Sequence, residues 1–176
     1  MKKTILSIAF AGLFLLMNNV CQAQADLSKG NVLLNGGLGF GYYYAGGVSI
    51  NFNAEFSITD EIGIGPYLGF TTWRYGYFGY RYNYTFIDFG VRGSYHFARL
   101  FNVTNDRFDP YGGIFIGYLS SSYSGPDGFD YSDPYGGAFR AGIHAGARYY
   151  FTSKFAGYGE VGVGLSPLTL GLTLKL

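Results

Sequence analysis

The chain has 176 residues, a formal net charge of +1, 29 glycines and 20% aromatic residues. The aromatic content excludes a disordered chain, the glycines lack the three-residue period of collagen, and the charge balance gives no indication of a nucleic-acid partner. Many aromatic residues and glycines with 13% charged residues are typical of an all-β protein.

Residues 1–25 are expected to be a cleaved signal peptide. Lys2 and Lys3 precede the short apolar run TILSIAFAGLFLLM, and the segment ends in AQA (23–25). The run is too short for a transmembrane helix. Lipidation at Cys21 is an alternative, but the preceding NNV lacks the small residues expected of a lipoprotein signal. The remainder, 26–176, is predicted to be one domain; it contains no cysteine and therefore no disulfide.

Alternation of apolar and polar residues dominates the chain after residue 26 and predicts eight β-strands. In GGVSINFNAEFSI (46–58), for example, Val48 to Ile58 fall on one side of an extended chain and Ser49 to Ser57 on the other. The tight turns TDE and TSK and the link ARLFNVTNDRFD join strands at one end. The more elaborate connections RYGYFGYRYN and SSSYSGPDGFDYSDPYG fall together at the opposite end. The predicted strands are 31–42, 46–58, 62–73, 83–97, 110–119, 136–150, 156–165 and 168–176.

The two sides of these strands differ in a way that predicts which side faces out. The strand 83–97 sets Ile87, Phe89 and Val91 opposite Asp88 and Arg92. A water-soluble barrel has an apolar interior, because burying unpaired charge is costly. Here the apolar side is continuous and suits lipid, whereas charges alternating with glycine suit a narrow lumen. Because strands in hydrocarbon cannot leave an open edge, we predict an eight-stranded antiparallel up-and-down transmembrane β-barrel. A soluble barrel with every strand inverted, binding an apolar ligand, is the structural alternative.

The register of the strand 110–119 is left open by its pattern. Ile114, Ile116 and Tyr118 are assigned to the lipid side, although Phe115 would favour the opposite register. Aromatic residues near the strand ends are predicted to form girdles at the two membrane interfaces. They are Tyr95, Phe97, Tyr149, Tyr150 and Phe155 at the turn end, and Tyr42, Tyr43, Trp73, Tyr118 and Tyr135 at the loop end.

The signal segment, the eight alternating strands and the closing LTLGLTLKL (168–176) resemble the small eight-stranded outer-membrane barrels of the OmpA transmembrane-domain and OmpX kind. The resemblance covers nearly all of 26–176 and depends on pattern rather than on a signature motif. It implies location in the outer membrane of a Gram-negative-type cell, contact with outer-membrane lipid and insertion by the barrel-assembly machinery. Leu176 is a departure, because such barrels usually end in an aromatic residue that the assembly machinery reads.

Inward-facing charges form the first candidate site. Hairpin counting places Glu160 near His144 and Arg148. Asp88 and Arg140 come from similar heights, as do Glu55, Arg92 and Arg148 nearer the turn end. Such charges either conduct small ions or fill an interior just wide enough for side chains. The second interpretation is favoured, and the resemblance implies that such a network acts mainly as a plug. The predicted lumen charge network consists of Glu55, Asp88, Arg92, Arg140, His144, Arg148, Glu160 and Lys175.

The aromatic connection 74–83 is the second candidate site. Aromatic rings with arginine can stack on sugars or hold lipopolysaccharide phosphates, although an interface girdle with a short hairpin is the simpler interpretation. Loops 74–83 and 119–136 are predicted to carry a structural or surface-interaction role, with an extracellular ligand or host surface as the partner class. A narrow pore for small solutes is the alternative, and a lipid-modifying enzyme is less favoured. The candidate contacts are Arg74, Tyr75, Tyr77, Phe78, Tyr80 and Arg81.

No catalytic, cofactor or metal residue is predicted. His96 and His144 both point inward, away from the outer-leaflet lipid that an enzyme of this size class would modify, so no hydrolytic triad can form at the substrate. Calcium could bind the acidic residues of the longest loop, but their spacing is not that of an EF-hand, and aspartate beside glycine, serine and proline is common in turns. Those residues are Asp127, Asp130 and Asp133.

Overall fold

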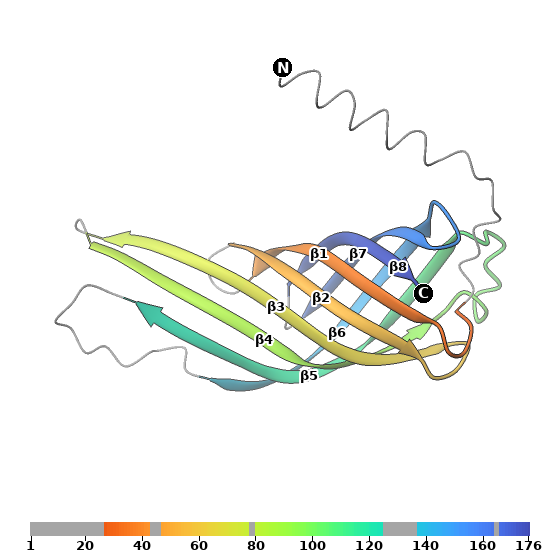
Figure 1. Ribbon diagram of the computed structural model, residues 1–176, viewed down its shortest axis with the longest axis horizontal. Helices are drawn as coiled ribbons and strands as arrows, with labels where there is room; N and C mark the ends of the chain where they lie inside the picture. Colours follow the sequence, from red (N-terminus) through yellow and green to blue (C-terminus); the bar gives the residue numbers. More distant parts are fainter. Residues whose placement is uncertain (1–26, 43–46, 78–79, 125–136, 164–165) are drawn as a thin grey trace, which may run out of the picture.

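Eight antiparallel strands follow one another in chain order around a closed barrel (Figure 1). The computed structural model describes residues 27–42, 47–77, 80–124, 137–163 and 166–176. β1 pairs with β8, which closes the sheet, and the predicted fold class and strand number are confirmed. Among the described residues, no helix is long and apolar enough to cross a membrane. The strands are β1 (Val32–Tyr42), β2 (Gly47–Ser57), β3 (Ile62–Tyr77), β4 (Tyr80–His96), β5 (Phe108–Ser124), β6 (Ala138–Tyr150), β7 (Phe155–Val163) and β8 (Leu168–Lys175).

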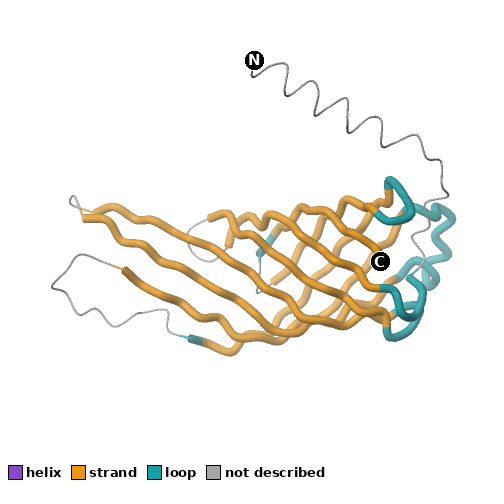
Figure 2. The backbone as a smooth tube through the Cα atoms, viewed as in Figure 1, coloured by secondary structure: helices purple, strands orange, loops and turns teal. Residues whose placement is uncertain are grey.

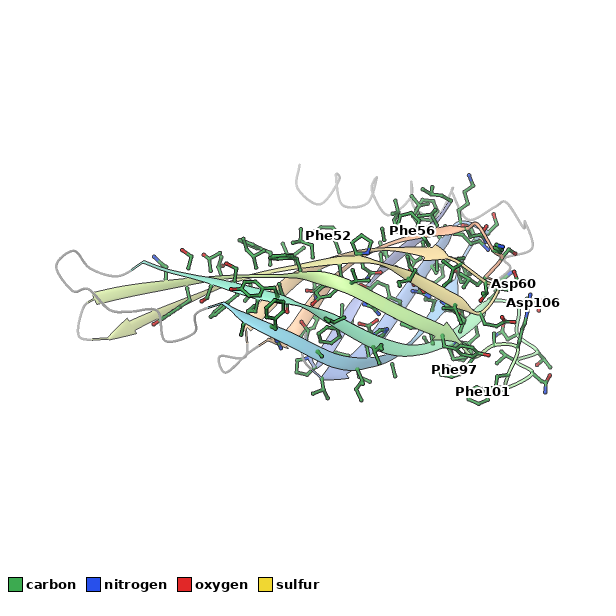
Figure 3. The ribbon with its side chains drawn as sticks, turned by 90° about the horizontal axis from the view of Figure 1, so that it is seen from below. Phe52, Phe56, Asp60, Phe97, Phe101 and Asp106 are labelled. Carbon is green, nitrogen blue, oxygen red and sulfur yellow. The ribbon has the colours of Figure 1, made fainter. Side chains whose placement is uncertain are left out.

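Large apolar side chains point outward on all eight strands. On β2, Phe52 and Phe56 are 56% and 47% exposed, and both stand on the outer surface in Figure 3, whereas Glu55 between them is buried. On β5, Ile114 and Ile116 are exposed and Phe115 is buried, which confirms the register assigned to this strand. Successive side chains of a strand point to opposite faces, so the alternation in the sequence determines these orientations.

Three strands are longer than predicted. The backbone ladder between β3 and β4 continues to Tyr77 opposite Tyr80, and β5 remains paired with β4 as far as Ser124. The prediction of loops is therefore wrong for 74–77, 80–82 and 120–124, while 78–79 and 125–136 lie outside the described residues. Tyrosine has a high β-propensity, and pairing between β3, β4 and β5 satisfies the backbone groups on the sides that face a neighbouring strand. The three strands extend well beyond the others at one end of the barrel (Figures 1 and 2).

Small apolar contacts lie inside the barrel toward both ends. At the loop end, Phe86 of β4 packs on Leu119 of β5. At the turn end, Tyr150 packs on Ala156, and both are almost fully buried. The prediction that Tyr150 belongs to the outer girdle is wrong, because the adjacent Tyr149 points outward and neighbouring residues of a strand cannot share a face. Of the other girdle residues, the side chains of Tyr42, Tyr43, Trp73 and Tyr135 lie outside the described part of the chain.

Candidate functional site

The inward side of β4 orders the polar side chains of the lumen by height. From the turn end upward, His96, Ser94, Arg92 and Asp88 are each buried, and they meet side chains from β2, β3, β5, β6 and β7. Three groups of contacts result, one above the other. Each group joins strands that are not neighbours in the barrel wall, so the contacts cross the lumen.

The lowest group, here called the turn-end cluster, consists of Glu55, His96, Asp109 and Arg148. Arg148 donates from Nη2 to Glu55 Oε2 at 2.6 Å and from Nη1 to Asp109 Oδ2 at 3.1 Å. His96 Nε2 lies 2.8 Å from Glu55 Oε1, and its Nδ1 lies 2.8 Å from Asp109 Oδ1. Because both ring nitrogens face a carboxylate, both carry a proton. Two anions and two cations therefore balance in a site whose side chains are at most 3% exposed.

The middle group is centred on Glu160 of β7. Arg92 donates to both of its carboxylate oxygens, at 3.2 and 2.6 Å, in the bidentate geometry that makes arginine–carboxylate pairs strong. Tyr111 donates its hydroxyl to Glu160 Oε2 at 3.0 Å. The ring of Tyr111 also lies 4.1 Å from the guanidinium carbon of Arg148, which connects the middle group to the turn-end cluster.

The upper group contains Asp88, Arg140 and Tyr67. Arg140 Nη1 lies 3.1 Å from Asp88 Oδ2, and the Tyr67 hydroxyl donates to Asp88 Oδ1 at 3.0 Å. The Tyr67 ring meets Phe115 edge-on, with centroids 5.6 Å apart. Phe115 lies opposite Arg92 in the ladder, between the middle and upper groups, whereas the Phe86–Leu119 contact begins level with Asp88 and continues toward the loop end.

β1, β2 and β8 form the opposite side of the lumen. Among its described residues, the charged ones are Glu55 and Lys175, and both lie at the turn end. Asn35 donates to Asn53 at 2.7 Å and accepts from Thr173 at 2.6 Å. Nearer the loop end, the hydroxyls of Ser49 and Ser166 lie 2.9 Å apart. The charges are thus concentrated toward β4, β5, β6 and β7.

The structure brings the predicted neighbours together and adds pairs that the sequence does not predict. Asp88 contacts Arg140, and Glu55 contacts Arg148. Glu160, in contrast, pairs with Arg92 across the lumen and not with Arg148. Hairpin counting places Glu160 correctly, since it lies opposite Gly146 and thus between His144 and Arg148 along β6. It considers adjacent strands alone, however, and misses Arg92, which closure of the barrel brings across from β4. The two remaining predicted residues bind elsewhere: His144 Nε2 lies 3.1 Å from Ser94 Oγ, and Lys175 Nζ lies 5.2 Å from the Tyr150 ring centroid.

The predicted network lacks four residues of these groups: Tyr67, His96, Asp109 and Tyr111. The sequence pattern places Asp109 in the link before the strand 110–119. A strand that starts two residues earlier, as β5 does, puts Asp109 in phase with the inward Tyr111. The side chains of Arg74, Tyr75, Tyr77, Phe78, Tyr80 and Arg81 lie outside the described part of the chain, as do Asp127, Asp130 and Asp133.

The chemistry open to this site follows from its contacts. The Arg92–Glu160 pair and the Arg148–Glu55 pair each connect opposite walls of the lumen. The Ser94–His144 contact resembles part of a hydrolytic site, but His144 Nδ1 has no hydrogen-bond partner among the described residues, so no third group there orients the imidazole as a triad requires. Within the described residues, no group of three or more His, Cys, Asp or Glu is placed to hold a metal ion.

Comparison with known proteins shows a likeness of fold. No protein-family model matches the chain. No curated protein matches it either. The N-terminal β-barrel domain of Pseudomonas aeruginosa OprF superposes with a TM-score of 0.51 at 16% identity, covering 84% of this chain and 98% of that domain. Ail, the attachment invasion locus protein of Yersinia pestis, in complex with the heparin analogue sucrose octasulfate, superposes with a TM-score of 0.55 at 10% identity, covering 83% and 96%. The chain therefore has the fold of the small eight-stranded outer-membrane barrels.

Proposed function

We propose that this protein is a non-catalytic outer-membrane barrel that holds a surface-interaction sheet beyond the membrane. The observation that carries the proposal is the continuation of three strands past the rim. We call residues 72–77 of β3, 80–86 of β4 and 120–124 of β5 the protruding sheet. Its strands stay paired to Tyr77 opposite Tyr80 and to Asn83 opposite Ser124, which supports an ordered binding surface.

The outer surface of the barrel supports a place in the membrane. Each large apolar side chain removed from water contributes about 1.5–3 kcal/mol, and such side chains point outward on every strand. The charged residues inside the barrel are incompatible with the alternative of a soluble barrel in which every strand is inverted, because that barrel would have an apolar interior. In this proposal, residues 1–25 are a cleaved signal peptide of a Gram-negative-type cell, the barrel-assembly machinery inserts residues 26–176, and outer-membrane lipid surrounds the apolar face.

The filled lumen favours a surface role over a pore. Four buried carboxylates are each paired with arginine or histidine, and the pairs connect opposite walls of the barrel. Such an interior acts as a plug and stabilises the barrel from within. The protein is then expected to show no sustained single-channel current in planar bilayers; a stable current of defined size would favour the pore.

The edges of the protruding sheet support contact with a partner. Among the described residues, the last pair between β5 and β6 is Leu119 with Ala138, and the last pair between β2 and β3 at this end is Ser49 with Thr71. Beyond these pairs, 72–77 and 122–124 have no further strand neighbour on their outer side within the described part of the chain, so these edges can pair with an extended segment of a ligand. Arg74 and Arg81 add positive charge to the same sheet, so a sulfated polysaccharide is the first ligand class to test.

The test compares matched arginine variants at the two ends of the barrel. Vesicles carrying the protein are passed over immobilised heparin, and binding is measured for Arg74→Gln/Arg81→Gln and for the turn-end control Arg99→Gln/Arg107→Gln. We expect the first pair to lose at least about tenfold in affinity and the control to bind normally. Replacing Tyr75, Tyr77 and Tyr80 by serine tests aromatic stacking in the same way.

The folded state and the membrane location are checked separately. A closed barrel resists SDS when unheated and shifts in mobility on boiling, so every variant is first examined in this way in the outer-membrane fraction. Heparin binding that is unchanged in both the arginine and the tyrosine variants would overturn the assignment of the binding surface. Recovery of unmodified protein in the soluble fraction, with no mobility shift, would overturn the membrane assignment.

A further inference from the structure

The segment between β4 and β5 contains a well-formed helical turn. The Phe101 N–H donates to the Phe97 carbonyl at 2.9 Å, and the Val103 N–H donates to the Ala98 carbonyl at 2.9 Å. Asn102 has a φ of +48°, the left-handed conformation that commonly ends a helix and satisfies its last carbonyls. We call residues 98–103 the capped turn. Its hydrogen bonds give its side chains defined directions.

Two large apolar side chains of the capped turn point away from the protein. Leu100 is 60% exposed and Phe101 is 64% exposed. The Phe101 ring stacks on Phe97, with centroids 5.4 Å apart, and Phe97 contacts Tyr95, with centroids 5.2 Å apart. Tyr95 belongs to the outward face of β4, so a continuous row of rings joins the apolar belt of the barrel to the capped turn. Figure 3 shows Phe97 and Phe101 together at the turn end, apart from Asp60 and Asp106.

The polar side of the capped turn is held by the neighbouring connection between β2 and β3. Arg99 Nη1 lies 3.1 Å from Asp60 Oδ2 and 2.9 Å from Glu61 Oε1. The backbone N–H of Lys29 donates to Asp60 Oδ1 at 2.9 Å. Arg99 therefore faces the adjacent turn, while Leu100 and Phe101 face outward.

We infer that the capped turn is a membrane-binding element whose Leu100 and Phe101 side chains insert into the interface of the phospholipid leaflet at the turn end. The inference rests on the proposed function, since it requires that the barrel spans a bilayer. The row of rings formed by Tyr95, Phe97 and Phe101 begins on the apolar belt of the barrel, which lipid surrounds in the proposed function. This continuity identifies lipid as the partner of the capped turn. Amphipathic segments with aromatic residues on the apolar side bind at this depth. The insertion fixes the depth of the turn end in its leaflet.

Single-tryptophan variants test the inference. The chain has one tryptophan, so Trp73→Phe provides a background without native tryptophan emission. Phe101→Trp is compared with Asp106→Trp in the same connection and with Ile114→Trp in the belt. Each protein is inserted into phosphatidylcholine vesicles whose lipids carry bromine either near the glycerol end or near the tail end of the acyl chains. Bromine quenches tryptophan by contact, so the pattern reports depth.

We expect Phe101→Trp to emit at shorter wavelength than Asp106→Trp. It should lose more of its emission to the shallow bromine than to the deep bromine, because aromatic residues of the interface lie at headgroup depth. Leu100→Trp gives the same readout should Phe101→Trp fail to fold. Quenching of Ile114→Trp but not of the tryptophans at 100 and 101 would overturn the inference and leave the membrane barrel intact.

Two further outcomes are distinguishable. A blue-shifted tryptophan at 101 that no brominated lipid quenches would show burial against a second copy or another protein, and would overturn lipid as the partner. Failure of bromine to quench Ile114→Trp would show that the barrel is not inserted, and the proposed function would then fall together with the inference.

Discussion

Replacing Arg148 by methionine is the sharpest test of the lumen as a plug. Arg148 is 2% exposed, pairs with Glu55 and Asp109, and lies over the Tyr111 ring. Methionine keeps much of the apolar stem, so the substitution mainly removes charge. Loss of one partner from a buried ion pair costs about 3–5 kcal/mol. Because His96 still contacts both carboxylates, we expect the low end of that range, about 3 kcal/mol.

A matched substitution and a double variant separate charge from packing. Arg99→Met removes an exposed arginine whose side chain and that of Asp60 are 49% and 44% exposed, and such pairs contribute about 0–1 kcal/mol. Glu55→Gln in the Arg148→Met background removes the charge left without its arginine. The two positions should therefore show a coupling energy of about 2 kcal/mol, within the range for residues in direct contact.

The assay is urea unfolding in phosphatidylcholine vesicles. The folded fraction is read from the unheated gel mobility and from far-ultraviolet circular dichroism, and the free energy of unfolding is extrapolated linearly to zero urea. If Arg148→Met destabilises the barrel no more than Arg99→Met does, the turn-end cluster is screened by water. The interior would then be a hydrated channel, and the pore would become the better interpretation.

Two further predictions concern the barrel wall and the turn end. A Cβ at Gly113 would overlap the backbone carbonyl oxygen of Gly93, whereas a Cβ at Gly93 would meet nothing closer than 3.8 Å. Gly113→Ala should therefore destabilise the barrel by about 2–3 kcal/mol, and Gly93→Ala by less than about 0.5 kcal/mol. Equal effects of the two substitutions in urea unfolding would refute this prediction. The hydrogen bond from the Lys29 backbone N–H, followed by that from Arg99, lowers the pKa of Asp60 below its ordinary value of 3.8. A lowered pKa means that this carboxylate stabilises the turn at neutral pH and that the contribution disappears as the pH falls through the lowered value. An NMR titration of Asp60 should show its pKa moving back toward 3.8 in Arg99→Met, and an unchanged pKa would contradict the assigned contacts.

The sequence by itself determined the strands and their faces. The direction of a side chain along a strand is a local property with a period of two residues, so the pattern of 46–58 places Phe52 outward and Glu55 inward, as the structure has them. It could not place the ends of the long strands. Whether 74–83 continues as ladder depends on a partner strand being present at the same height, and pairing between strands is not encoded in one strand's alternation. Tyr150 was misplaced because an aromatic at a strand end suggested a girdle, although its parity with Arg148 places it inside.

The tertiary structure alone decided which charges meet. Arg92 and Glu160 are 68 residues apart in sequence, and they form a pair because closure of β1 on β8 sets β4 and β7 opposite each other across a narrow lumen. The same closure brings Glu55, His96, Asp109 and Arg148 from four strands into one cluster. Alternation shows which side chains enter the lumen, but their partners depend on the height and direction of every strand around the barrel, which only the closed ladder of eight strands establishes.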